Sequence, residues 1–172
     1  MTLIRAFEFI KSKVHKVKSR KSVKSIKSNL KLVLVGEVAW KSESTVRAVE
    51  ESEFKDDIIL TGRVDFKELA MFYRLAKIFV FPSLHEGFGI PLLEAMASGT
   101  PVITADNSSL SEVGGEAVLK FESGNVDELT EQIKKLLLNE GLQRKMIEKG
   151  YERIKDFGWE KCARETMKVM KD

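Results

Sequence analysis

Five short apolar runs, separated by longer stretches with helical periodicity, constrain the fold of this chain more than any other feature. In chain order they lie within KLVLVGE (31–37), DIILTG (57–62), IFVFPS (78–83), PVITAD (101–106) and EAVLKF (116–121). Runs of this length are typical of strands that are buried on both faces, and no hairpin signal such as Asn-Gly joins them. The pattern predicts an α/β fold with a parallel sheet and helices on both faces.

The intervening stretches predict helices. Leu3, Phe7, Ile10, Val14 and Val17 recur at steps of four and three, which indicates an amphipathic N-terminal helix. The stretch 42–54 gives a weak helical signal. Further helices are expected after Asp65, over 91–98, and in 126–138, 140–155 and 159–171. Asp65 is placed to cap its helix or to lie in its first turn, and Ser109 with Glu112 predicts a capping box.

The length of 172 residues allows one domain, 1–172, with a basic extension at 1–30 and a last helix at 159–171. The chain is 43% hydrophobic and 32% charged, and no apolar run reaches the roughly 18 residues needed to span a bilayer. Lys11 and Lys13 interrupt the apolar start, so no signal peptide is expected. A single cysteine, Cys162, cannot form an internal disulfide, and we expect a cytoplasmic protein.

The positive charge is concentrated at the N-terminus. Residues 1–31 carry ten Lys or Arg residues against one acid, Glu8. Such a segment fits an anionic partner such as a membrane surface, here the inner face of the membrane, but it is more often a solvated helix face or loop. Neither His15 nor His85 has cysteine or carboxylate partners at metal-ligand spacing, so we expect no metal site and no cofactor.

The segment HEGFGIPLLEAMASGTPVI (85–103) carries the candidate chemistry. Pro91 is suited to a first helical turn and Gly99 to a helix end, which predicts a helix over 91–98. Gly87 and Gly89 precede it, where bare backbone lets N–H groups approach an anion such as a diphosphate at the positive helix end. Ligands of open parallel sheets bind beyond the carboxyl ends of the strands, which is where this loop, Gly36 and Gly62 lie.

Two acids flank this predicted anion site. Glu94 is expected in the first helical turn, close enough to accept hydrogen bonds from vicinal ribose hydroxyls, and Glu86 could accept them from the hydroxyls of a sugar. Together they would hold opposite ends of a sugar nucleotide. A purely structural interpretation stays open, because a glutamate near a helix start offsets the macrodipole and glycine-containing loops between strand and helix are common.

The order of Glu86, Gly-Phe-Gly-Ile-Pro, Glu94 and Gly-Thr-Pro-Val-Ile resembles the nucleotide-sugar half of retaining glycosyltransferases of family 4, which have the two-Rossmann-domain GT-B architecture. The likeness extends over roughly residues 30 to 170. The resemblance implies that Glu94 holds the ribose hydroxyls and that Glu86, the candidate catalytic residue, contacts the donor sugar. It implies further binding roles for Gly87, Phe88, Gly89 and Ile90 at the distal phosphate and sugar, for Arg63 and Val64 at the base, and for Gly36 in the same crevice.

Departures from the family pattern shape the expected function. The resemblance implies one half of a GT-B fold that lacks its first strand, the basic loop after that strand and the acceptor-binding domain. The chain therefore looks like a fragment or one subunit of a split enzyme, inactive alone, that serves transfer of a hexose from a UDP- or GDP-sugar to a glycan or lipid-linked acceptor without a metal. A non-catalytic sugar-nucleotide-binding subunit and a sugar-nucleotide epimerase half are the alternatives.

The last helix bears an apolar stripe that needs a partner surface. It consists of Trp159, Cys162, Ala163, Thr166, Val169 and Met170. In two-domain relatives this helix crosses back toward the acceptor domain. Here it is expected to pack on its own domain, to pair with another copy, or to stay exposed, in which case it favours self-association.

Overall fold

The computed structural model describes residues 1–12, 30–37 and 42–171, and it confirms the α/β class. Its elements run in the order α1 (Thr2–Ser12), β1 (Leu32–Leu34), α3 (Glu43–Glu50), η1 (Lys55–Asp57), β2 (Ile58–Leu60), α4 (Phe66–Leu75), β3 (Phe79–Phe81), α5 (Ile90–Ala97), β4 (Val102–Ala105), α6 (Ser108–Gly114), β5 (Val118–Phe121), α7 (Val126–Leu137), α8 (Glu140–Arg153), η2 (Ile154–Asp156) and α9 (Trp159–Val169). Val14, Val17 and most of the basic extension lie outside the described residues, so the predicted membrane surface is not tested.

All described strand pairs are parallel, as predicted, but they form two sheets rather than one. β1 pairs with β2, and β3, β4 and β5 form the second sheet in that order. Each strand is short and is followed by a helix, which is the arrangement that parallel connections require. Within the described residues no ladder joins β1 to β3.

Helices cover both faces of the three-stranded sheet. Neighbouring residues of a strand point to opposite faces, so on β4 Ile103 joins a core with α7 while Val102 joins a core with α5 and α6. Both side chains are fully buried. The result is a three-layer arrangement, with α4, α5 and α6 on one face and α1 and α7 on the other.

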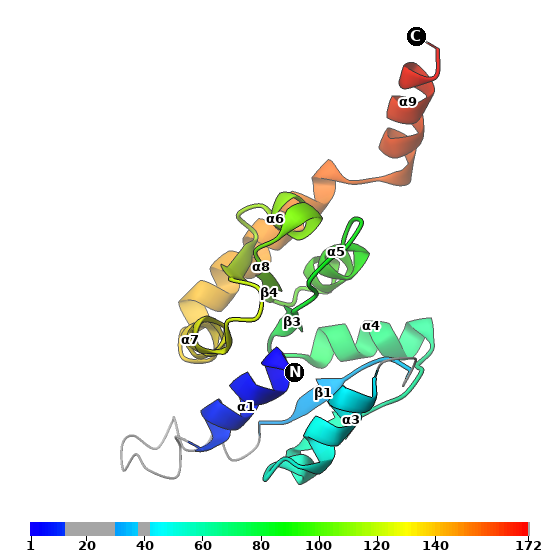
Figure 1. Ribbon diagram of the computed structural model, residues 1–172. Coiled ribbons are helices and arrows are strands. Elements are labelled where there is room, and N and C mark those ends of the chain that lie inside the picture. The colour runs from blue at the N-terminus through cyan, green and yellow to red at the C-terminus, as the bar shows by residue number, and fades with distance from the viewer. Residues whose placement is uncertain (13–29, 38–41, 172) are drawn as a thin grey trace.

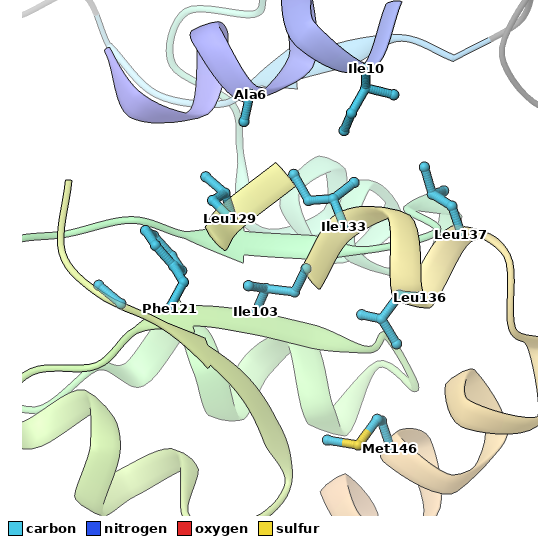
Figure 2. Packing of buried hydrophobic residues seen from close by; sticks show 10 residues of the cluster. Ala6, Ile10, Ile103, Phe121, Leu129, Ile133, Leu136, Leu137 and Met146 are labelled. Atoms are coloured by element: carbon cyan, nitrogen blue, oxygen red, sulfur yellow. The ribbon is translucent and has the colours of Figure 1, made fainter. Parts of the chain in front are cut away.

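Helix α1 lies across both sheets. Its Ala6 and Ile10 belong to the core of the three-stranded sheet, and Figure 2 shows them facing Leu129 and Ile133 of α7. Ile4 and Phe7 of the same helix belong to the core of the two-stranded sheet. The apolar side chains of this amphipathic helix, predicted from the sequence, therefore pack into two cores.

The local helix signals had mixed outcomes. Asp65 is the N-cap of α4, and its carboxylate accepts hydrogen bonds from the N–H groups of Lys67 and Glu68 while the Glu68 carboxylate accepts one from the Asp65 N–H. The capping box predicted at Ser109 is wrong, because Asn107 is the N-cap of α6. Ser109 lies two residues after the N-cap, inside the helix, and its hydroxyl donates instead to the carbonyl of Glu86.

The last helix stands away from the rest of the molecule, as Figure 1 shows. Every residue of α9 is exposed, including Trp159 at 83% and Val169 at 78%. Of the three alternatives for this helix, packing on its own domain is therefore wrong for the described residues. None of the described helices is long and apolar enough to cross a membrane.

Two lysines form ion pairs with Asp57, the residue just before β2. The ammonium of Lys11, a buried residue of α1, lies 2.5 Å from one carboxylate oxygen of Asp57, and that of Lys31 lies 2.6 Å from the other. Hydrogen bonds from Lys11 and then Lys31 hold the pKa of Asp57 below its usual range, against the opposing effect of burial. This cluster ties α1 to the two-stranded sheet.

Replacing Asp57 with Asn tests how much these ion pairs contribute to the free energy of unfolding. Because the folded-state pKa is depressed, the stabilisation is complete above the unfolded pKa near 3.8 and disappears as the pH falls through the folded pKa. We expect Asp57→Asn to lower the free energy of unfolding by about 1–2 kcal/mol at pH 7 and to have a smaller effect at pH 2.5, measured by urea denaturation.

Asp56 provides the matched control. It is adjacent, exposed, and its side chain makes no ion pair within the described part of the chain. Asp56→Asn should change stability by less than about 0.5 kcal/mol at either pH. An Asp57→Asn effect that is the same at both pH values would contradict the ion-pair explanation.

Candidate functional site

The carboxyl ends of β1 and β2 form the first part of the candidate site. Both strands lead into glycines with positive φ, Gly36 at 141° and Gly62 at 67°, and the Gly36 N–H donates to the Gly62 carbonyl at 3.2 Å. This contact brings Gly36 beside the turn that leads into Arg63 and Val64, and the resemblance implies one crevice for these residues. Arg63 is exposed and makes no ion pair with any described residue.

The loop between β3 and α5 forms the second part. It contains Glu86, Gly87, Phe88 and Gly89 and leads into Ile90, the first residue of α5. No hydrogen bond or ion pair between described residues joins this loop to the Gly36 and Gly62 turns. The predicted site residues therefore lie in two groups, one at the carboxyl end of each sheet.

Gly89 is the N-cap of α5, and the backbone there requires glycine. Its φ of 105° is strained for a residue with a side chain, and an added Cβ would lie 2.7 Å from Cδ2 of Leu110. The helix ends before Gly99, whose φ is 75°, as the sequence predicted. Both ends of α5 are therefore fixed by glycines.

The start of α5 differs from the prediction in one respect that affects the site. The helix begins at Ile90 rather than Pro91, so Glu94 is its fifth residue. Glu94 therefore lies beyond the first turn, whereas the sequence predicted it within that turn. Pro91 has no N–H, and the N–H of Leu92 already donates to the Gly89 carbonyl at 3.0 Å. Donors to an anion must therefore come mainly from the backbone of residues 87–90.

Glu94 has a defined orientation. The hydroxyl of Tyr73, from α4, donates to Oε2 of Glu94 at 2.9 Å. Tyr73 is buried, with 7% of its surface exposed, and its carbonyl accepts a hydrogen bond from the hydroxyl of Thr100 at 2.5 Å. Burial, and then the hydrogen bond to Glu94, raise the pKa of Tyr73, so it remains a donor at neutral pH.

Sequence reasoning did not identify Tyr73 as a site residue. It lies 21 residues before Glu94, and the sequence shows it as one more apolar position of α4. Its aromatic ring fills the core beside Phe79, with 5.2 Å between ring centroids. A tyrosine among phenylalanines and leucines is a weak signal that a buried hydroxyl needs a partner.

Asn107 and Ser109 of the α6 segment hold the loop that carries Glu86. The amide group of Asn107 donates to the carbonyl of Ser83 at 2.7 Å, and the Ser109 hydroxyl donates to that of Glu86 at 2.7 Å. The Asn107 amide oxygen is buried without a partner among the described residues. These bonds fix the backbone of the loop and leave the Glu86 side chain half-buried, with no described partner.

Phe88 connects the loop to the end of α8. Its ring packs edge-on against Phe157, with centroids 5.7 Å apart, and the guanidinium of Arg153 lies over the Phe157 ring at 4.8 Å. Arg153 also donates to the carbonyls of Val113 and Glu112 at the end of α6. The glycine loop is therefore supported on the side of Phe88 by an aromatic pair.

Two surface hollows lie elsewhere. One, of about 410 Å³, is lined by α7 residues such as Glu131 and Lys135, and the other, of about 400 Å³, lies between α1 and Phe54. Neither includes a predicted site residue. Among the described residues no group of three or more His, Cys, Asp or Glu side chains could hold a metal ion.

Comparison with known proteins places this geometry in context. The family model described as "Glycosyl transferases group 1" matches residues 2–153. The chain is 34% identical over 140 residues to O-antigen chain mannosyltransferase B of Escherichia coli, covering 81% of this chain and 37% of that protein. The chain thus spans about two fifths of the length of this curated relative.

Solved structures share the fold. Sucrose-phosphate synthase from Thermosynechococcus elongatus superposes with a TM-score of 0.72 at 26% identity, over 87% of this chain and 41% of that one. A variant of TarM from S. aureus, solved in complex with UDP, fondaparinux and α-GlcNAc-glycerol, superposes with a TM-score of 0.79 at 20% identity, over 99% of this chain and 32% of that one.

The glycine requirement at the start of α5 can be tested directly. Gly89→Ala should lower the free energy of unfolding by about 1–3 kcal/mol, because it combines an unfavourable φ with a clash against Leu110. Gly87→Ala is the control, since no atom lies within 4 Å of an added Cβ there and its φ is not in the left-handed range. Urea denaturation of both variants checks this, and equal effects would contradict it.

Proposed function

Because the chain belongs to the family of glycosyl transferases group 1, we propose that it is the donor-binding part of a retaining glycosyltransferase. The reaction is transfer of a hexose from a UDP- or GDP-sugar to a glycan or lipid-linked acceptor, with the acceptor surface supplied by the rest of the enzyme. The E. coli relative is a mannosyltransferase, so mannose is the donor sugar to test first.

The fixed carboxylate of Glu94 carries this proposal. Tyr73 occupies Oε2, which leaves Oε1 available to accept hydrogen bonds. An ionised acceptor held in one orientation beside a bare glycine loop suits the two vicinal hydroxyls of a ribose, which are neutral donors at a fixed spacing. Tyr73 then acts as a positioning residue, because it fixes the direction of the carboxylate.

The other predicted residues take complementary roles. The backbone of Gly87, Phe88, Gly89 and Ile90 binds the distal phosphate and the sugar, and Glu86 accepts hydrogen bonds from the sugar hydroxyls. At the carboxyl ends of β1 and β2, the backbone of Arg63 and Val64 meets the base and Gly36 lines the crevice. The TarM structure was solved with UDP, which supports a nucleotide as the ligand of this fold.

The chemistry assigned to this half is binding and stabilisation of the leaving group. Backbone N–H groups of residues 87–90 face the phosphate whose charge grows as the glycosidic bond breaks, and preorganised donors are most effective there. We propose that transfer proceeds with retention and without a metal ion.

Two other functions remain as alternatives. A non-catalytic sugar-nucleotide-binding subunit would bind the donor and never transfer the sugar, even with the acceptor-binding part present. A sugar-nucleotide epimerase half would change the sugar without an acceptor. NMR analysis of the products distinguishes the three cases: a transferred sugar, an altered sugar nucleotide, or an unchanged donor.

Nucleotide binding tests the role of Glu94. We expect Glu94→Ala to weaken the binding of UDP or GDP by roughly 1.5–3 kcal/mol, through loss of a charged acceptor, and Tyr73→Phe to weaken it by about 0.5–1.5 kcal/mol. NMR titration suits the weak affinity expected of this part alone. Glu112→Ala is the control, because that glutamate is exposed on α6. Unchanged affinity in Glu94→Ala would refute the ribose role.

The role of Glu86 is tested by comparing two ligands. Glu86→Gln should leave the affinity for the free nucleoside diphosphate within about twofold, while any additional affinity for the corresponding hexose nucleotide falls by about 1–2 kcal/mol. The same titrations with UDP and UDP-glucose, and with GDP and GDP-mannose, provide the comparison. A variant that loses affinity equally for both ligands would contradict a contact to the sugar.

A further inference from the structure

The N–H groups of residues 87–90 are the donors that the proposed function assigns to the phosphate. Within the described part of the chain none of them donates a hydrogen bond, so all are available to an anion. Glycine loses more backbone freedom on ordering than any other residue, and Gly87 and Gly89 make up two of these four positions. A loop of this composition needs an anchor, and Phe88 carries the only side chain between the two glycines.

The ring of Phe88 is held by Phe157 and not by a hydrophobic core. The two rings meet edge-on with their centroids 5.7 Å apart. Neither phenylalanine belongs to the core clusters of the described residues, and Phe88 keeps 45% of its surface exposed. The pair therefore lies outside the burial that drives folding, yet it fixes the middle residue of the glycine loop.

Arg153 holds the ring of Phe157 in turn. Its guanidinium lies 4.8 Å from the ring centroid, at a distance where a cation is attracted to the aromatic face. Nε donates to the carbonyl of Val113 and Nη2 to that of Glu112, at 3.0 and 2.7 Å, and Nη1 donates to the carboxylate of Asp156 at 2.7 Å. Because each nitrogen already has a partner, Arg153 supports the ring and does not serve as a phosphate ligand.

These contacts form a closed circuit through α6. At the start of that helix the Ser109 hydroxyl donates to the carbonyl of Glu86 at 2.7 Å, and at its end Arg153 holds the last carbonyls. The loop is thus tied to α6 twice, directly at Glu86 and through Arg153 and the two rings at Phe88. The two ties lie on either side of Gly87, so they fix the backbone before and after that glycine.

We propose that Phe88, Phe157 and Arg153 form a unit, here named the aromatic brace, that holds the N–H groups of residues 87–90 in their phosphate-binding arrangement before the ligand arrives. Phe157 and Arg153 are positioning residues, since they act through the Phe88 ring and do not touch the ligand. The assignment to a phosphate rests on the proposed function, whereas the hold on the loop rests on the contacts. A preordered loop loses less entropy on binding, so the brace raises affinity for the distal phosphate and not for the nucleoside.

The order of the loop backbone, measured by nitrogen-15 NMR relaxation on the full 172-residue chain without nucleotide, tests the brace. We expect the amide order parameters of residues 87–89 to lie above about 0.8 in the unaltered chain and to fall below about 0.6 in Phe157→Ala. Phe157→Tyr keeps the ring and should keep this order. Trp159→Ala is the matched control, because it removes a larger ring from the same segment, 83% exposed and without a ring contact to any described residue.

A second arm compares nucleotides that differ only in the distal phosphate. NMR titrations with UDP and UMP, and with GDP and GMP, give the preference of each variant for the diphosphate. Phe157→Ala should reduce that preference about fivefold or more and leave the affinity for the monophosphate within about twofold. A merely structural role would weaken both ligands alike. Phe157→Tyr and Trp159→Ala should keep the preference within about twofold of the unaltered chain.

Two further variants test the route of the effect. Because Phe157 is proposed to act through Phe88 alone, Phe88→Ala and the double variant Phe88→Ala/Phe157→Ala should have the same diphosphate preference within about twofold. Arg153→Lys keeps the charge, but lysine cannot lie flat over the ring while donating to both carbonyls, and it should lower the preference at least about twofold. Amide shifts of α7, on the opposite face of the sheet, report that each variant is folded.

The arms separate failure of the brace from failure of the proposed function. Loop order that is unchanged in Phe157→Ala, that falls as far in Trp159→Ala, or losses that add in the double variant would each overturn the brace. Loss of loop order without any change in diphosphate preference would overturn its phosphate role. An unaltered chain that binds none of the four nucleotides would refute the proposed function, and the order parameters would still decide whether the rings hold the loop.

Discussion

The packing of α1 against two cores is the interaction on which the described structure depends. Strand hydrogen bonds hold each sheet together but, among the described residues, they do not cross from β1 to β3. The connection between the sheets is therefore made by side chains, with Ile4 and Phe7 on one side of the helix stripe and Ala6 and Ile10 on the other. The buried ammonium of Lys11, paired with Asp57, adds a polar contact to the smaller sheet.

The candidate site follows from the same arrangement, because parallel strands place their carboxyl ends at one edge. That edge combines a glycine loop, whose backbone is not covered by side chains, with a carboxylate that is held in one orientation. Gly89 admits no side chain, and Tyr73 orients Glu94 from a second helix. Hydrogen bonds from Asn107 and Ser109 hold the backbone of the loop that carries Glu86. A rigid loop with one oriented carboxylate can discriminate hydroxyl donors, which a mobile glutamate could not do without a larger loss of entropy.

Features that depend on neighbouring residues in the sequence were predictable. The strands, the Asp65 N-cap and the end of α5 before Gly99 all rest on local backbone preferences, and each was found where the pattern placed it. The Ser109 capping box failed because Asn107, two residues earlier, is a competing cap with extended backbone. The contact between Tyr73 and Glu94 and the division of the sheet depend on packing between distant segments, for which the sequence pattern carries no local signal.

The division of the sheet explains why the candidate site has the form of two groups rather than a closed pocket. A sugar nucleotide is long enough to need contacts to base, ribose, phosphates and sugar, and the residues proposed for the base lie on the smaller sheet while those for the phosphates and sugar lie on the larger one. Among the described residues, α1 and Leu30 pack against the cores of both sheets, and packing of aliphatic side chains is less directional than a hydrogen-bonded ladder. A nucleotide that contacts both groups would favour one arrangement of that adjustable contact, so affinity for the nucleotide and the packing of α1 are expected to be coupled, each favouring the other by the same free energy.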